Sequence, residues 1–214
     1  MYVPAHFSVP DREALYRLIR ENPLGILVTH GDGGLDANHI PFEVDPQPGR
    51  HGVLRAHVAR GNPVWKNVAN GAEVLVIFRA EDAYVSPNWY PTKHESHKQV
   101  PTWNYRVVHA HGTIAFHDDE AFLRGLVGRL TRAHEASQTV PWQMNDAPPD
   151  YIAAMLQAIV GLEIGLTRLV GKFKLSQNRE LRDRLSLAEA LTKQGDTALA
   201  QATLDAMTTS PERR

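Results

Sequence analysis

The segment from Ala83 to Gly112 constrains the fold more than any other part of this sequence. It carries two of the four tryptophans, Trp89 and Trp103, together with several tyrosines and prolines, between two strand-like runs. A hairpin joins adjacent strands with about two to five residues, whereas Ser86 to Thr102 is a far longer connection. Disordered segments are poor in aromatic residues. We therefore interpret the segment as an ordered loop that forms one wall of a binding site for a flat ligand with a polar tail.

Short strand-like runs separated by turns and helical segments make up most of the remaining chain. Gly31 to Gly34 can supply the positive φ angles of a hairpin turn, and Pro41 lacks an amide donor, which places its strand at an edge or a bulge. The predicted strands are Leu24–His30, Leu35–Val44, Val53–Val58, Glu73–Arg79, Tyr84–Ser86, Trp103–His117 and Gly161–Val170. This pattern predicts a mainly β fold, with six or seven antiparallel strands in a small closed or split barrel and helices at its periphery.

Helix signals fall in the gaps between these strands and at the C-terminal end. Asn62-Pro63 is predicted to cap a short helix that carries Trp65, and acidic residues after His117 start another. The segments 179–191 and 197–207 have the spacing of two surface helices. We predict one principal domain, residues 1–185, followed by a C-terminal helical tail, residues 186–214.

The composition excludes several classes of function. The formal net charge of -1 gives no general attraction to nucleic acid or to anionic membranes, and the absence of cysteine rules out disulfides and thiol chemistry. The most apolar window, 151–170, is interrupted by Gln157, Glu163 and Arg168, so no membrane span is expected. The first ten residues do not resemble a secretion signal. These features favour a cytoplasmic protein.

Histidines offer one alternative chemistry. His109 and His111 lie two residues apart on a predicted strand, and His39 and His57 lie on other strands, so three imidazoles could meet around a metal. No acidic ligand accompanies them, and histidines are often partly buried without any ligand. We predict no metal site. No nucleophile elbow, Walker loop or dinucleotide-binding glycine turn is found either.

A different feature suits a phosphate group. The strand Val53–Val58 leads His57, Arg60 and Asn62 toward the start of the Pro63 helix, where amide groups and basic side chains could converge. Further positive charge is available from four lysines, Lys93, Lys98, Lys172 and Lys174. The simpler interpretations are an ordinary helix cap with Arg60 in water, and a packed loop with core tryptophans. Together, the phosphate site and the aromatic wall suggest a planar ring with a phosphorylated tail.

Five segments of the sequence resemble a known family. They are HIPFEV (39–44), LRAHVARGNPVW (54–65), AYVSPNWYPTK (83–93), VPTWNYRVVHAHG (100–112) and GKFKLSQNR (171–179). In this order they are similar to the PaiB family, FMN-binding negative transcriptional regulators of bacteria, from Met1 to about Leu185. The resemblance implies an FMN-binding split β-barrel, related to pyridoxamine-phosphate oxidases and flavin reductases. It also implies a homodimer with FMN in the cleft between the subunits.

The resemblance also implies which residues contact FMN. The second strand should run its backbone along the flavin, and the turn after the third strand should hold the phosphate. The partner subunit should contribute from the long loop, the rest of which covers the ring, and a late motif should lie near the cleft. In chain order, the implied cofactor-binding residues are Asn38, His39, Ile40, Pro41, His57, Arg60, Asn62, Trp89, Tyr90, Lys93, Thr102, Trp103, Asn104, Lys174 and Gln177.

Three functions remain open from the sequence. The first is a flavin-binding transcriptional regulator, although no helix-turn-helix is visible and the basic run of Arg179, Arg182 and Arg184 is interrupted by acids, so direct DNA binding is not supported. The second is an FMN-dependent oxidoreductase or flavin reductase, whose catalytic residues the sequence does not identify. The third is a haem-binding or haem-degrading protein, which rests on split-barrel relatives and the histidines.

Overall fold

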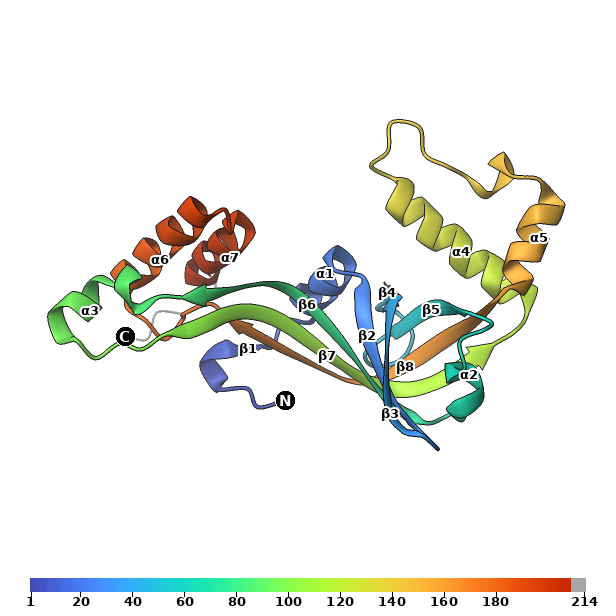
Figure 1. Cartoon of the computed structure of the whole chain (residues 1–214), viewed down its shortest axis with the longest axis horizontal. Helices are drawn as coiled ribbons and strands as arrows, with labels where there is room; N and C mark the ends of the chain where they lie inside the picture. The colour runs from blue at the N-terminus through green and yellow to red at the C-terminus, as the bar shows by residue number, and fades with distance from the viewer. Residues whose placement is uncertain (209–214) are drawn as a thin grey trace. The chain divides into compact units, whose positions relative to one another are not determined.

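An antiparallel sheet of eight strands runs through the computed structural model, which describes residues 1–208 (Figure 1). The hydrogen-bonded order is β3-β2-β6-β7-β8-β5-β4, and β1 pairs separately with β8. The strands are β1 (Ser8–Val9), β2 (Leu24–Gly31), β3 (Gly34–Pro41), β4 (Glu43–Asp45), β5 (Val53–Ala59), β6 (Glu73–Val85), β7 (Thr102–His117) and β8 (Ile159–Lys174). The sheet does not close into a barrel, and the mainly β fold predicted from the sequence is confirmed.

Three differences relate the eight observed strands to the seven predicted runs. The predicted strand 35–44 is broken at Phe42, whose amide bonds the carbonyl oxygen of Pro23 at 2.8 Å, and β4 begins after it. The runs predicted as 73–79 and 84–86 are one continuous strand, β6, because residues 80–83 also keep an extended backbone. The two-residue β1 is too short to be recognised by any periodicity.

Seven α-helices and three short 3-10 helices lie between the strands in the described part of the chain. The α-helices are α1 (Arg12–Glu21), α2 (Val64–Asn67), α3 (Pro91–Ser96), α4 (Glu120–Glu135), α5 (Pro149–Gln157), α6 (Leu181–Gln194) and α7 (Thr197–Thr208). The 3-10 helices are η1 (Ala5–Phe7), η2 (Pro87–Trp89) and η3 (Met144–Asp146). As predicted, an acidic residue begins α4, because Asp119 Oδ1 accepts the amide of Phe122 at 2.8 Å. Over residues 1–208, none of these helices combines the length and apolar character that a bilayer crossing requires.

The chain divides into two compact units. The first unit consists of Met1–Leu18, Arg79–Val108 and the chain from Val170 onward, and the second consists of Ile19–Phe78 and His109–Leu169. The long strands β6, β7 and β8 contribute residues to both units.

The second unit is built on the β2–β3 hairpin and on β5 paired with β8. Gly34, at φ 95°, closes the hairpin, and β3 pairs with β2 alone, which confirms the edge position expected from Pro41. A side chain at Gly25 would come within 2.7 Å of the Phe78 ring, so the core there requires glycine. Helix α4 packs against β8, since a Cβ at Gly161 would lie 2.6 Å from Phe122.

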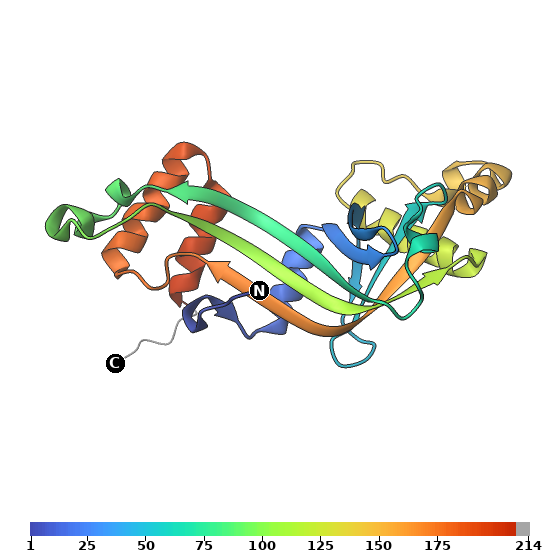
Figure 2. The same ribbon diagram turned by 60° about the horizontal axis from the view of Figure 1, so that its bottom comes forward.

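The first unit places a pair of helices against the ends of the long strands. Figures 1 and 2 both show α6 and α7 packed together as a hairpin, and Gly195, at φ 92°, forms the turn between them. Their buried leucines share one apolar cluster with Val85 of β6 and with Tyr90 of the long loop. The domain boundary predicted after residue 185 falls within α6.

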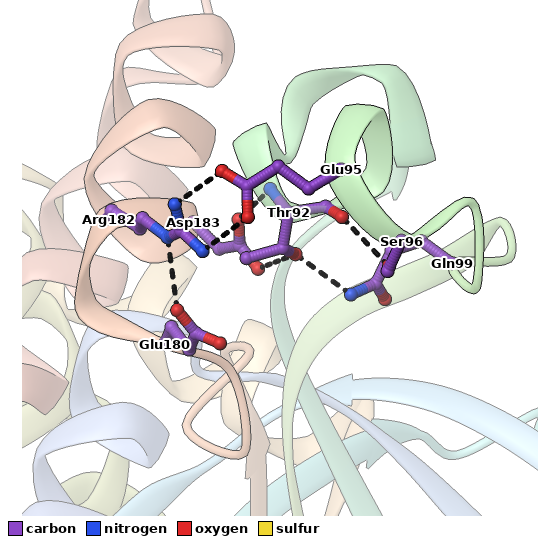
Figure 3. A network of polar contacts seen from close by, with 7 residues as sticks. All are labelled: Thr92, Glu95, Ser96, Gln99, Glu180, Arg182 and Asp183. Carbon is purple, nitrogen blue, oxygen red and sulfur yellow. Dashed lines mark hydrogen bonds and ion pairs between the residues drawn. The ribbon is translucent and has the colours of Figure 1, made fainter.

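Polar contacts join the long loop to α6 (Figure 3). The buried Asp183 accepts hydrogen bonds from Thr92 N at 3.0 Å and from Thr92 Oγ1 at 2.6 Å, and Gln99 donates to the same hydroxyl. At the surface, Arg182 forms a bidentate ion pair with Glu95. The loop predicted to be ordered is therefore ordered, because its helix α3 is bonded to α6.

Candidate functional site

The residues implied by the resemblance divide between the two units. Residues of the β2–β3 hairpin and of the turn after β5 belong to the second unit, and residues of the long loop and of the end of β8 belong to the first.

Strand β3 presents an uncovered surface in the second unit. Most of its side chains are exposed, Leu35 by 78%, and within β3 only Ile40 is buried. An edge strand also leaves a row of backbone donors and acceptors without strand partners. A flat polar ligand could bond to such a row, as the resemblance implies for Asn38 to Pro41.

The guanidinium of Arg60 is already fully engaged. Its Nη1 donates to Asp118 Oδ2 at 2.9 Å and Nη2 pairs with Asp118 Oδ1, while Nε donates to the carbonyl oxygen of Gln157 at 2.5 Å and Nη2 to that of Ile159 at 3.0 Å. The hydrogen bonds to Asp118 raise the pKa of Arg60. Arg60, one of the predicted phosphate ligands, is therefore already paired with a carboxylate.

Asn62 connects the turn after β5 to the edge strand. Its Oδ1 accepts the amide of Val64 at 3.0 Å, which starts α2 as the sequence predicted, and its Nδ2 donates to Asn38 Oδ1 at 2.7 Å. Two of the implied FMN-binding residues, from segments far apart in the sequence, therefore contact each other directly.

The side chain of His57 is half-buried. Burial lowers its pKa, and its Nδ1 has no hydrogen-bond partner among residues 1–208. It lies opposite Gly161 in the β5–β8 pair, so its ring shares the face on which Phe122 of α4 packs. A neutral imidazole beneath a helix adds no positive charge for a phosphate.

The histidines do not assemble a metal site in the part of the chain that is described. No group of three or more histidine or acidic side chains there could hold a metal ion. The rings of His109 and His111 lie 6.4 Å apart, and Arg168 Nη2 is 3.0 Å from His111 Nε2. Burial is the main cause that lowers the pKa of both histidines.

The long loop in the first unit contributes two interior side chains. Tyr90 and Asn104 are completely buried, and both hydrogen-bond to Ser176 Oγ, at 3.1 Å in each case. The contacts of these two residues therefore fit the simpler interpretation, in which the loop packs into the interior of the protein. Trp89 is half-buried against the helix cluster and borders a surface hollow of about 340 Å³ beside α6.

Trp103 behaves differently from the other loop aromatics. It is 53% exposed and packs edge-to-face against Tyr84, which is itself 46% exposed, with the ring centroids 6.1 Å apart. Lys93 is half-buried on α3. An exposed aromatic pair on neighbouring strands is the kind of surface that a ring or a second protein covers.

The last motif forms a braced turn at the end of β8. Gln177 Oε1 accepts the amide of Leu175 at 2.8 Å and its Nε2 donates to the carbonyl oxygen of Phe173 at 2.6 Å, around Ser176 at φ 62°. Lys174 Nζ donates to Thr102 Oγ1 at 2.6 Å and to the carbonyl oxygen of Trp103 at 2.5 Å. Burial, Lys172 and Arg179 together lower the pKa of Lys174. Gln177 therefore shapes the turn, while Lys174 joins β8 to the loop.

Comparison with known proteins decides the family. The model of the family described as "Putative FMN-binding domain" matches residues 1–168. The chain belongs to this FMN-binding family. Its PaiB-type relative in Bacillus subtilis, "Protease synthase and sporulation protein PAI 2", is 31% identical over 191 residues, 89% of each chain. The uncharacterised protein AN0679 of Emericella nidulans is 36% identical over 219 residues, covering 86% of this chain and 87% of its own.

Solved structures support the split-barrel fold of the FMN-binding family. The FAD and heme binding protein of Mycobacterium smegmatis has a TM-score of 0.53 at 21% identity, covering 78% of this chain and 73% of that one. The flavocytochrome Anf3 of Azotobacter vinelandii has a TM-score of 0.61 at 13% identity, covering 80% and 72%. At these identities the likeness concerns the fold, and it confirms the split-barrel class predicted from the sequence.

The donor groups present are compatible with FMN, the cofactor of the family. In the second unit, the edge of β3 offers backbone groups that could bond to a ring. In the first unit, taken by itself, the exposed Tyr84 and Trp103 offer aromatic surface. Within residues 1–208, Lys172 and Lys174 on β8 form no ion pair with a carboxylate, so they could contact a phosphate. Sequence reasoning missed Asp118 as the partner of Arg60, and it named Lys172 without recognising that Lys172 and Lys174, two apart on a strand, share one face.

Proposed function

We propose that the protein works as a homodimer that binds FMN in the cleft between its subunits and that it regulates transcription indirectly, through the state of its flavin. The observation that carries this proposal is the exposed pair of Tyr84 and Trp103. Large aromatic side chains left in water on a sheet are typical of an interface or a ligand surface. In a dimer they would be covered by the second copy and the bound ring.

The residues implied by the resemblance are proposed to serve this cleft in two ways. Asn38 to Pro41 would face the flavin with their backbone, and Asn62 would hold that strand in place through its bond to Asn38. Trp103, with Thr102 as its neighbour, would come from the partner subunit. The bound isoalloxazine would supply the ability to accept and release electrons, and the protein would supply its position and its exclusion from water.

Direct DNA reading is not part of the proposal. The second helix of the α6–α7 hairpin, residues Thr197–Thr208, contains no lysine or arginine. On α6, Arg182 pairs with Glu95 and Glu180, and the side chain of Arg184 is buried. Two of the three arginines of the basic run are therefore paired or buried, and Arg179 alone would supply little of the positive charge that DNA binding needs.

Light scattering and flavin absorbance on the same sample test the dimer and the cleft. We expect the mass of two subunits, with flavin bands near 370 and 450 nm, as for any oxidised flavoprotein. Trp103→Ala should weaken both dimerisation and flavin retention. The matched control is Trp142→Ala, because Trp142 is similarly exposed at 43% but lies in the α4–α5 connector. A monomer that holds FMN fully, or equal losses in both variants, would reject the shared cleft.

A redox assay and a mobility-shift assay separate regulation from catalysis. Flavin that stays oxidised for minutes under anaerobic NADH or NADPH fits a sensor, whereas rapid bleaching indicates an FMN-dependent oxidoreductase. A shifted DNA band at physiological salt with the purified protein would contradict the indirect mode of regulation.

A further inference from the structure

The end of β8 in the first unit concentrates positive charge that has no carboxylate partner. Lys172 and Lys174 lie on the strand and Arg179 follows the braced turn. Among the described residues none of these three makes an ion pair. Other basic residues of the same unit do, since Arg106 is paired with Glu81 and Arg182 with Glu95. The three basic groups at the end of β8 therefore differ from Arg106 and Arg182, whose charges are balanced by carboxylates.

Aromatic rings and hydrogen bonds hold these basic groups in place. Lys172 Nζ lies 5.3 Å from the centre of the Tyr105 ring and 5.9 Å from that of Tyr2, and Lys174 Nζ lies 5.7 Å from that of Phe7. Arg179 lies over the buried Tyr90 at 5.3 Å. Two of the three ammonium donors of Lys174 are taken by Thr102 and Trp103, which leaves one donor for a ligand.

The cluster is electrostatically unfavourable in the protein alone. Lys174 is half-buried, and both Lys172 and Arg179 lie near enough to lower its pKa in addition to the effect of burial. Like charges kept together without acids destabilise one another, and an anion placed among them would relieve that repulsion. A phosphate monoester suits the position because it carries close to two negative charges at neutral pH and accepts several charged hydrogen bonds.

We propose that Lys172, Lys174 and Arg179 form the subsite for a phosphate monoester. This inference rests on the proposed flavin function for its first source of that group, the phosphate of FMN. A separate phosphorylated metabolite is the second source. Arg60 does not fill this role, because Asp118 already neutralises it, and α2 beside it has only four residues, Val64–Asn67.

Paired titrations with FMN and riboflavin test the assignment, because the two ligands share the ring and differ in the phosphate. Arg179→Gln and Lys172→Gln should each weaken FMN about tenfold and the double variant still more, whereas riboflavin affinity should change less than about twofold. Lys172→Arg keeps the charge and should retain most FMN affinity. Lys193→Gln, an exposed lysine on α6, is the matched control. Thermal melts of each variant ensure that only folded protein is compared.

Each outcome has a distinct meaning. Selective loss of FMN assigns the flavin phosphate to the cluster. Unchanged FMN affinity, with inorganic phosphate raising the melting temperature of the wild type but not of the double variant, assigns the subsite to another phosphorylated ligand. Unchanged FMN affinity with no phosphate effect overturns the proposal, as does an equal loss of FMN and riboflavin. If the wild type binds neither FMN nor riboflavin, the proposed function is refuted. The melting temperatures measured with inorganic phosphate then test the subsite by themselves.

Discussion

The turn after β5 and the end of β8 both carry basic side chains, but they differ in what those side chains already contact. Arg60 is bonded to Asp118 and to two carbonyl oxygens, so its charge is satisfied within the second unit. Lys172, Lys174 and Arg179 contact aromatic rings and neutral oxygens, and among residues 1–208 no carboxylate pairs with them. The presence or absence of a carboxylate partner therefore distinguishes Arg60, which has a structural role, from the basic residues at the end of β8, which are available to a ligand.

The same difference is found between two adjacent residues of α6. Asp183 is buried and bonded to Thr92 through both carboxylate oxygens. Arg184 is only 7% exposed, and its Nε and Nη2 have no partner within the described chain. Asp183 and Arg184 therefore allow a buried charge with hydrogen-bond partners to be compared with a buried charge that has unpartnered donors.

The largest effect is expected from Asp183→Ala. The change would leave the amide and hydroxyl of Thr92 without their acceptor and release α3 from α6, so we expect the free energy of unfolding to fall by about 3 kcal/mol. Urea denaturation measures it, and limited proteolysis should cut the 86–102 loop earlier. Glu95→Ala, which removes an exposed partner of Arg182 in the same network, should change stability little. Equal effects of the two changes would contradict the distinction.

Arg184→Met should act in the opposite direction. Methionine fills a similar volume without a buried charge, so the free energy of unfolding should rise by about 1 kcal/mol. The measurement is the same urea titration, with the exposed Arg17→Met as control. A clear loss of stability would mean that the guanidinium has a role that its contacts do not reveal.

A smaller effect should appear as acid sensitivity in the second unit. Burial lowers the folded-state pKa of His57, so below its ordinary pKa of about 6.5 the unfolded chain binds a proton that the folded protein does not. Stability should therefore decline as the pH falls from 6.5 toward the folded-state pKa. His57→Gln should show a smaller drop in melting temperature between pH 7.5 and 5.5 than the wild type. The pKa values of His109 and His111 are also lowered, so these two residues should maintain part of the dependence of melting temperature on pH. Identical slopes in both proteins would show that His57 is protonated in the fold.

The smallest effect is expected at Arg60. If its charge is already satisfied, Arg60→Gln should change the ratio of FMN to riboflavin affinity by less than about twofold. Fluorescence titration beside Arg179→Gln provides the direct comparison. A tenfold fall in the ratio of FMN to riboflavin affinity in Arg60→Gln, without a fall in Arg179→Gln, would indicate that the phosphate binds at the turn after β5.

Most of the strands, and the helix caps, were predictable from local sequence. Pro41 fixed its strand at an edge, Asn62 and Asp119 began helices as expected, and the aromatic loop is ordered. What local patterns could not provide were partners distant in the chain. Asp118 follows β7 and meets Arg60 only because the turn after β5 and the start of β8 are brought beside it, and Asp183 meets Thr92 across ninety-one positions.

The candidate site was harder to predict for the same reason. Whether Tyr90, Trp89 or Trp103 faces solvent depends on α6 and α7, which cover the first two and leave Trp103 exposed. The alternation of Lys172 and Lys174 was visible in the sequence. That they have no acidic partner is a property of the folded neighbourhood and cannot be read from spacing.

The attachment of α3 to α6 also has a consequence for how such proteins can diverge. Because Thr92 depends on Asp183, a shortened gene that ends near residue 180 would deprive the aromatic loop of its support as well as removing the last helices. Insertions or deletions in the loop should therefore be inherited together with compensating changes in the C-terminal hairpin.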